Sequence, residues 1–294
     1  MPDSARKLVV VPCCGLGNRI QAIVCGQLLA EDTGRELHVN WTPAAVDCAV
    51  EYERLFVSAY PALADLPDDT VCYSSLQRYL SAVPERYWPM LKRYAHQWFR
   101  RIREDPAATI AVFTCHQFLD YFNDPRFPDR LRRLLVSVRP EIRAEVDGFA
   151  ARHFGHFTVG IHVRRTDWRS QRHLGYYLRQ MRQFPDAVFF VCSDDPSVPA
   201  EIRARHPRTV EYPKTSLSRQ DSEGLVQALI DMLLLAKTQY LIGTQGSTFS
   251  AIARVAGGIQ GPMHGQSLSR RDLQLGNLRG LGRKLLRRVT GGWV

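Results

Sequence analysis

The second half of the sequence alternates regularly between short apolar runs and segments with helical spacing. The apolar runs occupy residues 158–163, 187–193, 209–213 and 238–243, and a segment with helical spacing follows each of them. Parallel strands cannot be joined by a tight turn and usually need a helix that crosses back over the sheet. The alternation therefore predicts a doubly wound parallel sheet and an α/β fold for this half.

The first half opens with the same pattern. The run KLVVV at 7–11 indicates a buried strand, a helix follows PCCGLGN and ends at Gly34, and a second strand covers 36–41. A further strand is expected at 110–116, whereas residues 43–110 are expected to form helices and loops.

Composition bounds the class of protein. With 294 residues, 45% of them apolar and 23% charged, the chain has the size of two globular halves, and we expect them to meet near residue 150 with a cleft between them. The formal net charge of +10 indicates an anionic partner, either nucleotide phosphates, a nucleic acid or a lipid surface, although solubility alone would also account for it. Seven cysteines without a C-x-x-C pair suggest neither a zinc site nor a redox motif, and most are expected to be small buried residues in a reducing compartment.

The two ends of the chain bear on location. The apolar run in MPDSARKLVVVP is too short for a signal peptide, and no stretch is predicted to span a membrane, so we expect a cytoplasmic protein. The tail at 269–294 is basic and apolar on one side, which fits a helix lying peripherally on the inner face of a membrane. A terminal helix that packs on the N-terminal half is the alternative.

Ligands of open parallel sheets bind beyond the carboxyl ends of the strands. Arg164 and Arg165 directly follow the first strand of the second half. Ser247 and Thr248 begin a helix after its last strand. Two adjacent arginines at the end of a buried strand are costly unless an anion lies there, and a helix start offers free N–H groups to the same anion. We therefore expect a phosphate between them, with Asp167 pairing one arginine and orienting the other. A salt bridge between the halves and an ordinary helix cap are the alternatives.

Carboxylates and glycines near other strand ends complete the candidate site. The order Asp-Asp-Pro-Ser at 194–197 is expected to cap a helix, with the proline in its first turn, and Asp194 is expected to lie at the nucleotide, where the pair would touch a ribose hydroxyl. The order Asp-Asp, rather than Asp-x-Asp, argues against a metal site. Asp231 lies on an otherwise apolar helix and needs a partner, either the donor groups of a guanine base or a buried arginine. Gly15, Gly17 and Asn18 form a turn that offers N–H groups to a phosphate, but the dinucleotide fingerprint is not met because isoleucine replaces its third glycine.

These motifs occur in one order: GLGNR, then HVRRTD, then SDDPS, then LIDM before a T-x-x-S-T segment. The set resembles the fucosyltransferase superfamily of α-1,6-, nodulation, α-1,2- and protein O-fucosyltransferases, with the α-1,6 type most similar. It covers about residues 8–30 and 157–257, and 43–150 is unmatched. The resemblance implies a GT-B arrangement of two Rossmann-like domains, 1–150 for the acceptor and 151–294 for the donor. It also implies GDP-fucose as donor, inversion at the sugar carbon, a glycan or lipid-linked glycan acceptor, and no metal or other cofactor.

The resemblance also implies roles for the residues that match. Arg164 would hold the β-phosphate of GDP during catalysis, and His162 and Asp231 would lie near the guanine. The remaining candidates would contact the nucleotide or its phosphates: Gly15, Gly17, Asn18, Arg165, Asp167, Asp194, Ser247 and Thr248.

One departure from the family leaves a role open. Related α-1,6 enzymes carry a glutamate a few residues after the aspartate of H-x-R-R-x-D, whereas this chain has WRSQRHL there. The base that accepts the proton of the acceptor is therefore unassigned. Two alternatives stay open for the whole chain. The first is a transferase for another GDP-sugar or nucleotide-sugar. The second is a nucleic-acid-binding protein, against which no recognisable nucleic-acid module is present, so no nucleic-acid partner is expected.

Overall fold

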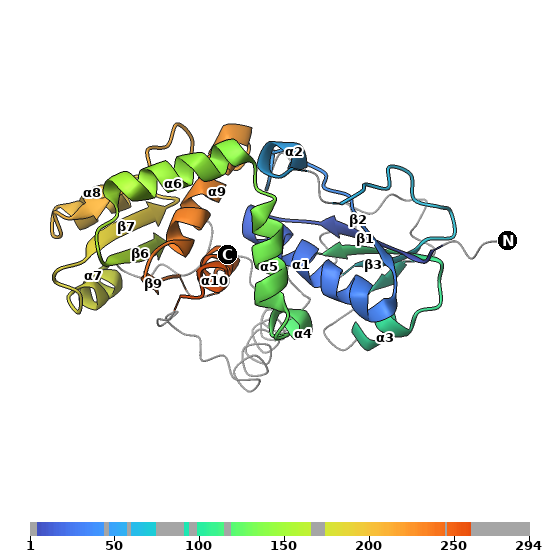
Figure 1. Cartoon of the computed structure of the whole chain (residues 1–294). Helices are drawn as coiled ribbons and strands as arrows, with labels where there is room; N and C mark the ends of the chain where they lie inside the picture. Colours follow the sequence, from blue (N-terminus) through green and yellow to red (C-terminus); the bar gives the residue numbers. More distant parts are fainter. Residues whose placement is uncertain are drawn as a thin grey trace, which may run out of the picture.

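A computed structural model describes residues 5–43, 47–57, 60–74, 91–93, 99–114, 119–165, 174–244 and 246–259 (Figure 1). In this part of the chain, two sheets lie side by side with helices around and between them. Every strand pair within them is parallel. The expectation of an α/β chain with parallel sheets is therefore confirmed.

The first sheet has five strands among the described residues, in the order β2-β1-β5-β3-β4. Their bounds are Lys7–Pro12 for β1, Glu36–Val39 for β2, Val71–Ser74 for β3, Leu91–Arg93 for β4 and Thr109–Thr114 for β5. Helix α1 (Leu16–Thr33) follows β1 and ends where Gly34 takes the left-handed conformation, with φ of 59°, that glycine adopts without strain. The strand, helix and strand expected at the start of the chain are therefore confirmed.

Strands β3 and β4 correct the expectation that residues 43–110 contain only helices and loops. Both strands are short, VCYS and LKR, and neither carries an apolar run of the kind that identifies a buried strand. Their place comes from backbone pairing, since β3 pairs with β5 and β4 extends the sheet from β3. Most of the aromatic, arginine-rich stretch at 78–103 lies outside the described residues.

The second sheet has four strands in the described part of the chain, in the order β8-β7-β6-β9. They are β6 (Thr158–Val163), β7 (Val188–Ser193), β8 (Thr209–Val210) and β9 (Tyr240–Ile242). Helices alternate with them: α7 (Gly175–Met181), α8 (Ser197–Arg203), α9 (Ser222–Ala236) and α10 (Thr248–Gly257). All four predicted strands and the helix after each are confirmed, and the adjacency of β7, β6 and β9 brings their carboxyl ends to one edge.

Further helices connect and cover the two sheets. They are α2 (Tyr52–Leu55), α3 (Phe99–Glu104), α4 (Leu119–Phe122), α5 (Phe127–Val136) and α6 (Pro140–His153). Helix α5 lies between the sheets in Figure 1 and contacts both α1 and α10, whereas α6 contacts α9. One apolar cluster joins the two halves, because buried residues of β1 and α1, such as Leu8 and Ile20, belong to the same cluster as Leu229 of α9 and Ile252 of α10. The halves are thus packed together through α1, α9 and α10.

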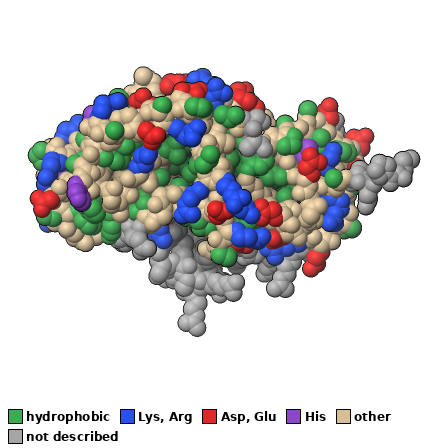
Figure 2. All heavy atoms as spheres, viewed as in Figure 1, with side chains coloured by type: hydrophobic (Ala, Val, Ile, Leu, Met, Phe, Trp, Pro, Cys, Tyr) green, Lys and Arg blue, Asp and Glu red, His purple; other side chains and the backbone are tan. Residues whose placement is uncertain are grey.

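The face shown in Figure 2 carries basic side chains beside acidic ones rather than a purely basic patch. On α5 and just before it, Arg126 pairs with Asp124 at 2.8 Å and with Asp32 of α1 at 2.9 Å, and Arg130 pairs with Glu31 at 2.7 Å. Such exposed pairs each contribute only about 0–1 kcal/mol to stability. They join α5 to α1 and account for part of the arginine content without a ligand.

Most of the described cysteines are buried, as expected: Cys13, Cys25, Cys48, Cys72 and Cys192 are buried, and Cys14 is half-buried. Across the described ranges, none of the helices combines the length and the apolar character needed to cross a bilayer. The basic tail at 269–294 lies outside the described residues.

Candidate functional site

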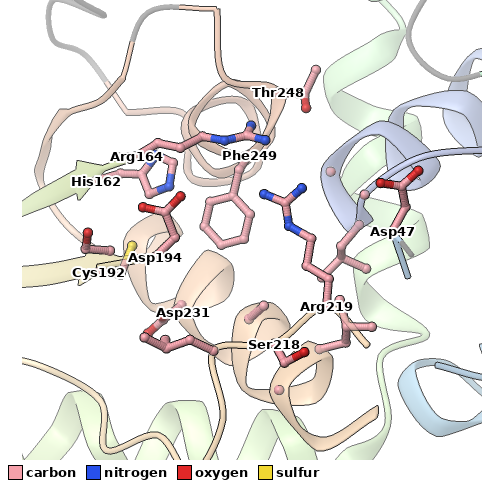
Figure 3. A pocket seen from close by; sticks show the side chains of 18 of the residues that line it. Asp47, His162, Arg164, Cys192, Asp194, Ser218, Arg219, Asp231, Thr248 and Phe249 are labelled. Atoms are coloured by element: carbon pink, nitrogen blue, oxygen red, sulfur yellow. The ribbon is translucent and has the colours of Figure 1, made fainter. Parts of the chain in front are cut away.

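A pocket of about 460 Å³ opens where the carboxyl ends of β6, β7 and β9 face the start of α1 (Figure 3). This volume lies within the range of small-molecule sites. Its described lining comes from both halves: Cys14, Gly15, Leu16, Gly17, Asn18, Asp47, His162, Arg164, Cys192, Ser193, Asp194, Lys214, Ser216, Leu217, Ser218, Arg219, Gly224, Leu225, Ala228, Asp231, Gly246, Thr248 and Phe249. The three strand-end segments singled out from the sequence therefore meet at one cavity.

Thr244 fixes the backbone from which Arg164 enters the pocket. Its buried hydroxyl donates to the carbonyl of His162 at 2.9 Å and accepts the backbone N–H of Arg164 at 3.1 Å. The hydroxyl of Tyr177 lies 2.9 Å from the hydroxyl oxygen of Thr244. Because β6 and β9 are tied at this point, the guanidinium of Arg164 is directed into the cavity (Figure 3).

His162 is a buried, neutral wall of the pocket. Its Nδ1 lies 2.6 Å from the hydroxyl of Ser250, and its ring stacks on Phe249 with 4.9 Å between the centroids. Burial lowers the pKa of His162 to about 4, and the nearby charge of Arg164 acts in the same direction. The ring is therefore uncharged near neutral pH and serves as a flat, fixed surface with a hydrogen-bonding edge.

Asp231 of α9 is a buried carboxylate with one oxygen paired and one unpaired. Its Oδ2 lies 3.0 Å from the Nζ of Lys214, whereas Oδ1 has no hydrogen-bond partner among the described residues. Burial raises the pKa of Asp231 to about 6, although Lys214 opposes the rise. Buried polar atoms are normally hydrogen-bonded, so an unpartnered oxygen on a pocket-lining residue indicates a place for a ligand donor. The protein partner is a lysine rather than the arginine considered from the sequence.

The side chain of Arg165 does not face the anion site with Arg164, which corrects the expectation of a twin-arginine clamp. Its guanidinium donates to Asp195 at 3.1 Å and to Glu201 of α8 at 3.4 Å, and it is not part of the described pocket lining. These two ion pairs hold the Arg165 guanidinium against Asp195 and α8 rather than in the pocket. The backbone N–H of Arg165 donates to Asp194 at 2.7 Å, which ties the ends of β6 and β7 together.

The two aspartates after β7 divide the roles expected for the pair. The carboxylate of Asp195 accepts the backbone N–H of Ser197, the first residue of α8, at 2.9 Å, which agrees with the expected helix cap. Hydrogen bonds from Ser197 lower the pKa of Asp195. Asp194 lines the pocket instead, where its carboxylate lies among the labelled residues of Figure 3.

The glycine turn after β1 meets the start of α10 across the pocket. Thr248 donates to the side-chain oxygen of Asn18 at 2.6 Å, which links the two halves directly. A Cβ atom on Gly17 would lie 3.0 Å from the backbone nitrogen of Phe249, tighter than most real contacts, so this close approach of α1 to α10 favours glycine. Helices α1 and α10 both begin here and direct N–H groups and positive dipole ends towards the cavity.

Ser247 is buried, accepts the backbone N–H of Ser250 as the cap of α10, and is not among the described residues that line the pocket. Asp167, together with the rest of the segment 166–173, lies outside the described residues. No group of three potential metal ligands occurs among the residues that the structure describes.

Several residues that line the pocket were not predicted from the sequence. Lys214 and Arg219 come from the loop between β8 and α9, and Asp47 comes from the loop after β2. Figure 3 shows Arg219 directed into the pocket. Loop residues carry no periodic signal, so the hydrophobic pattern could not identify them.

No family profile matches the chain, and no curated protein matches it. Solved structures do. The fucosyltransferase NodZ from Bradyrhizobium is 23% identical, with a TM-score of 0.61 over 85% of this chain and 93% of that one. A NodZ α-1,6-fucosyltransferase crystal soaked with GDP-fucose aligns with the same TM-score of 0.61 and identity of 23%, over 85% of this chain and 92% of that one.

More distant structures agree. A mutant of Arabidopsis thaliana FUT1 in complex with GDP is 16% identical, with a TM-score of 0.60 over 88% of this chain and 70% of that one. POFUT1 in complex with GDP is 13% identical, with a TM-score of 0.54 over 88% of this chain and 97% of that one. At these identities the likeness shows the fold. The chain has the fold of these fucosyltransferases, as the ordered motifs had indicated.

Proposed function

We propose that this protein is a glycosyltransferase that moves fucose from GDP-fucose to a hydroxyl group of a glycan acceptor. One observation carries the proposal. The pocket holds the buried carboxylate of Asp231, with its unpartnered oxygen, near one side, and Arg164 with two helix starts near the other. The fold around it is shared with three fucosyltransferases that were crystallised with GDP or GDP-fucose. These groups match the two chemical ends of a guanosine diphosphate.

The base end of the proposed complex is Asp231. The Watson–Crick edge of guanine offers an N1–H and an exocyclic amine, which suit the unpartnered Oδ1 of this carboxylate. Adenine and the pyrimidines lack this pair of adjacent donors. The stacked rings of His162 and Phe249 provide a flat surface beside it.

The diphosphate end is formed by Arg164 and the starts of α1 and α10. An acceptor hydroxyl attacks the anomeric carbon from the face opposite the diphosphate, so the sugar carbon is inverted as GDP leaves. Negative charge grows on the β-phosphate while the bond breaks, and fixed positive groups that meet this charge lower the barrier. Because Arg164 and the helix N–H groups supply that charge, we propose that transfer needs no divalent cation.

The two halves have different parts in this proposal. The second sheet and its loops hold the nucleotide, the first half supplies the glycine turn and the acceptor side, and the two form a GT-B enzyme with the pocket in the cleft. The side-by-side sheets and the pocket lining from both halves support this arrangement.

The substitution Arg164→Ala tests the proposal. We expect the turnover of GDP-fucose to fall by about 10²–10³-fold, the usual loss when one donor to developing negative charge is removed. Thermal unfolding should stay near that of the wild type. The matched control is Arg165→Ala, which breaks only partly exposed ion pairs to Asp195 and Glu201 and should retain most of the activity. Normal turnover in the Arg164 variant would exclude the proposed role.

A ligand panel tests the donor. Thermal-shift measurements with GDP, UDP, ADP and CMP, each with and without a chelator, should show stabilisation by GDP alone and no effect of the chelator. Stabilisation by UDP or ADP instead would favour another nucleotide-sugar. Transfer of fucose to a panel of glycan and lipid-linked acceptors, read by mass spectrometry, would identify the acceptor.

A further inference from the structure

Transfer to a hydroxyl group releases a proton that some group must accept. In the described part of the chain, three carboxylates line the pocket, those of Asp47, Asp194 and Asp231. A carboxylate in the correct position is a common general base. The question is which of the three faces the sugar rather than the nucleotide.

Two of these carboxylates have other positions and partners. Asp231 of α9 is buried and pairs with Lys214 of the preceding loop, at the side of the pocket that suits a purine base. Asp194 follows β7 and accepts the backbone N–H of Arg165, next to the strand end from which Arg164 enters. Both belong to the second half, which holds the nucleotide in the proposed complex.

Asp47 comes from the first half and lies on another wall of the pocket. It follows β2 and is partly exposed to solvent. Two contacts hold the residues that follow it. The indole of Trp41 donates to the carbonyl of Val50 at 2.7 Å, and the backbone N–H of Ala49 donates to the carbonyl of Arg219 at 3.1 Å. The second contact docks the loop onto the segment just before α9, across the junction of the two halves.

Figure 3 shows Asp47 beside the first half and Asp231 on the far side of the cavity from it. A nucleotide with its base at Asp231 and its diphosphate at Arg164 and the helix starts directs the attached sugar away from Asp231. The sugar and the attacking hydroxyl are then on the side of the pocket that the first half forms. Asp47 is the pocket carboxylate that this half contributes within the described residues.

We propose that Asp47 is the general base of the transfer, an assignment that rests on the function proposed above. The acceptor oxygen forms a bond to the anomeric carbon while its proton passes to the carboxylate of Asp47. The bond from the anomeric carbon to the β-phosphate oxygen breaks, and its electron pair leaves with GDP. Release of the proton to water returns Asp47 to its starting state, so no oxidant, metal or further reactant is needed.

The test uses acceptors that do not depend on knowing the glycan. GDP release from GDP-fucose is measured with water as acceptor for the wild type, Asp47→Asn, Asp47→Ala and Glu51→Gln. Glu51 is the matched control, an exposed carboxylate on the same segment that is not among the described pocket residues. We expect both Asp47 variants to lose about 10²-fold or more in turnover, within the usual contribution of a general base. GDP affinity by calorimetry should stay within about threefold of the wild type, and Glu51→Gln should behave as the wild type.

Sodium azide separates a base from a structural residue. The azide ion carries no proton, so its attack on the anomeric carbon needs no base. In Asp47→Ala, azide should restore GDP release and yield fucosyl azide, detected by mass spectrometry. Full water-dependent turnover in Asp47→Asn would overturn the assignment. A loss of GDP affinity as large as the loss of turnover would also overturn it, as would the absence of fucosyl azide from a variant that still binds GDP.

Failure of the underlying function gives a different pattern. The proposed transfer itself is contradicted if the wild type binds no GDP, or if it binds GDP but releases none from GDP-fucose with either water or azide. The assignment of Asp47 as the base then fails as well. A wild type that turns over while the Asp47 variants match it contradicts only the assignment of the base.

Discussion

Binding of GDP-fucose should weaken as the pH falls below about 6, because the proposed contact to guanine requires an ionised Asp231. Burial raises the pKa of this carboxyl to about 6, against the opposing effect of Lys214. The protonated carboxyl carries a hydrogen on the edge that must accept the N1–H and the amine of the base. The proton and the nucleotide therefore compete, and affinity is present above this pKa and lost as the pH falls through it.

The size of the effect follows from the same pKa. If only the ionised form of Asp231 binds, the protein is competent to bind only in that fraction of molecules. The apparent dissociation constant is therefore multiplied by one plus the ratio of protonated to ionised carboxyl. With a pKa of about 6 the factor is about 1.1 at pH 7 and about 11 at pH 5, a change of roughly 1.4 kcal/mol. His162 adds little over this interval, since its pKa of about 4 keeps its ring neutral.

Calorimetric titration with GDP-fucose at pH 5, 6, 7 and 8 is the assay. GDP-fucose is used instead of GDP because the free terminal phosphate of GDP titrates at about pH 6 and would add its own pH dependence. Repeating each titration in buffers of different ionisation enthalpy counts protons, and about 0.9 proton should be released at pH 5 against about 0.1 at pH 7. Asp231→Asn should bind more weakly and without this pH dependence. An affinity that is constant from pH 5 to 7 in the wild type, or the same slope in the variant, would refute the reasoning.

Further predictions concern the contacts that shape the pocket. Gly17→Ala should lower the free energy of unfolding by about 1–3 kcal/mol, the usual cost of overpacking, because its Cβ would press on the backbone of Phe249. In Gly15→Ala the added Cβ meets nothing within 4 Å, so chemical denaturation of the two variants should give clearly different midpoints. Thr244→Val should cost about 1–3 kcal/mol in the same assay, since it leaves the N–H of Arg164 and the carbonyl of His162 without their hydroxyl partner. Its affinity for GDP, measured by calorimetry, should fall as well.

The strands that the sequence predicted correctly are those that are buried on both faces. Strands β6 and β7 are buried along almost their entire length, so each reads as a continuous apolar run that periodicity identifies. The site followed from them, because the carboxyl ends of neighbouring parallel strands must share an edge. Strands β3 and β4 were missed because three or four residues of mixed character depend on pairing partners that lie far away in the sequence.

Side-chain direction and loop placement were the parts that the sequence did not determine. Arg165 is adjacent to Arg164 in the chain, but its guanidinium pairs with Asp195 and with Glu201 of α8, carboxylates that lie 30 and 36 residues further on. Lys214 is 17 residues from Asp231 and comes from an irregular loop, so their pairing is visible only after folding. Asp47 has no motif around it, and its place in the pocket depends on the backbone contact between Ala49 and Arg219 across the two halves.

The charges of this pocket are better explained by a ligand than by stability. A buried ion pair such as that of Asp231 and Lys214 gains little, because the cost of removing both charges from water roughly offsets their attraction, and apolar replacements of similar volume are often as stable. The unpartnered Oδ1 adds a further cost that no residue in the described chain offsets. The starts of α1 and α10 also carry a cost, because they meet at Gly17 and Phe249 and their positive ends repel each other unless negative charge lies between them. The proposed guanosine diphosphate would offset the last two costs at once, with donors for the unpartnered Oδ1 at one end and negative charge for the helix starts at the other.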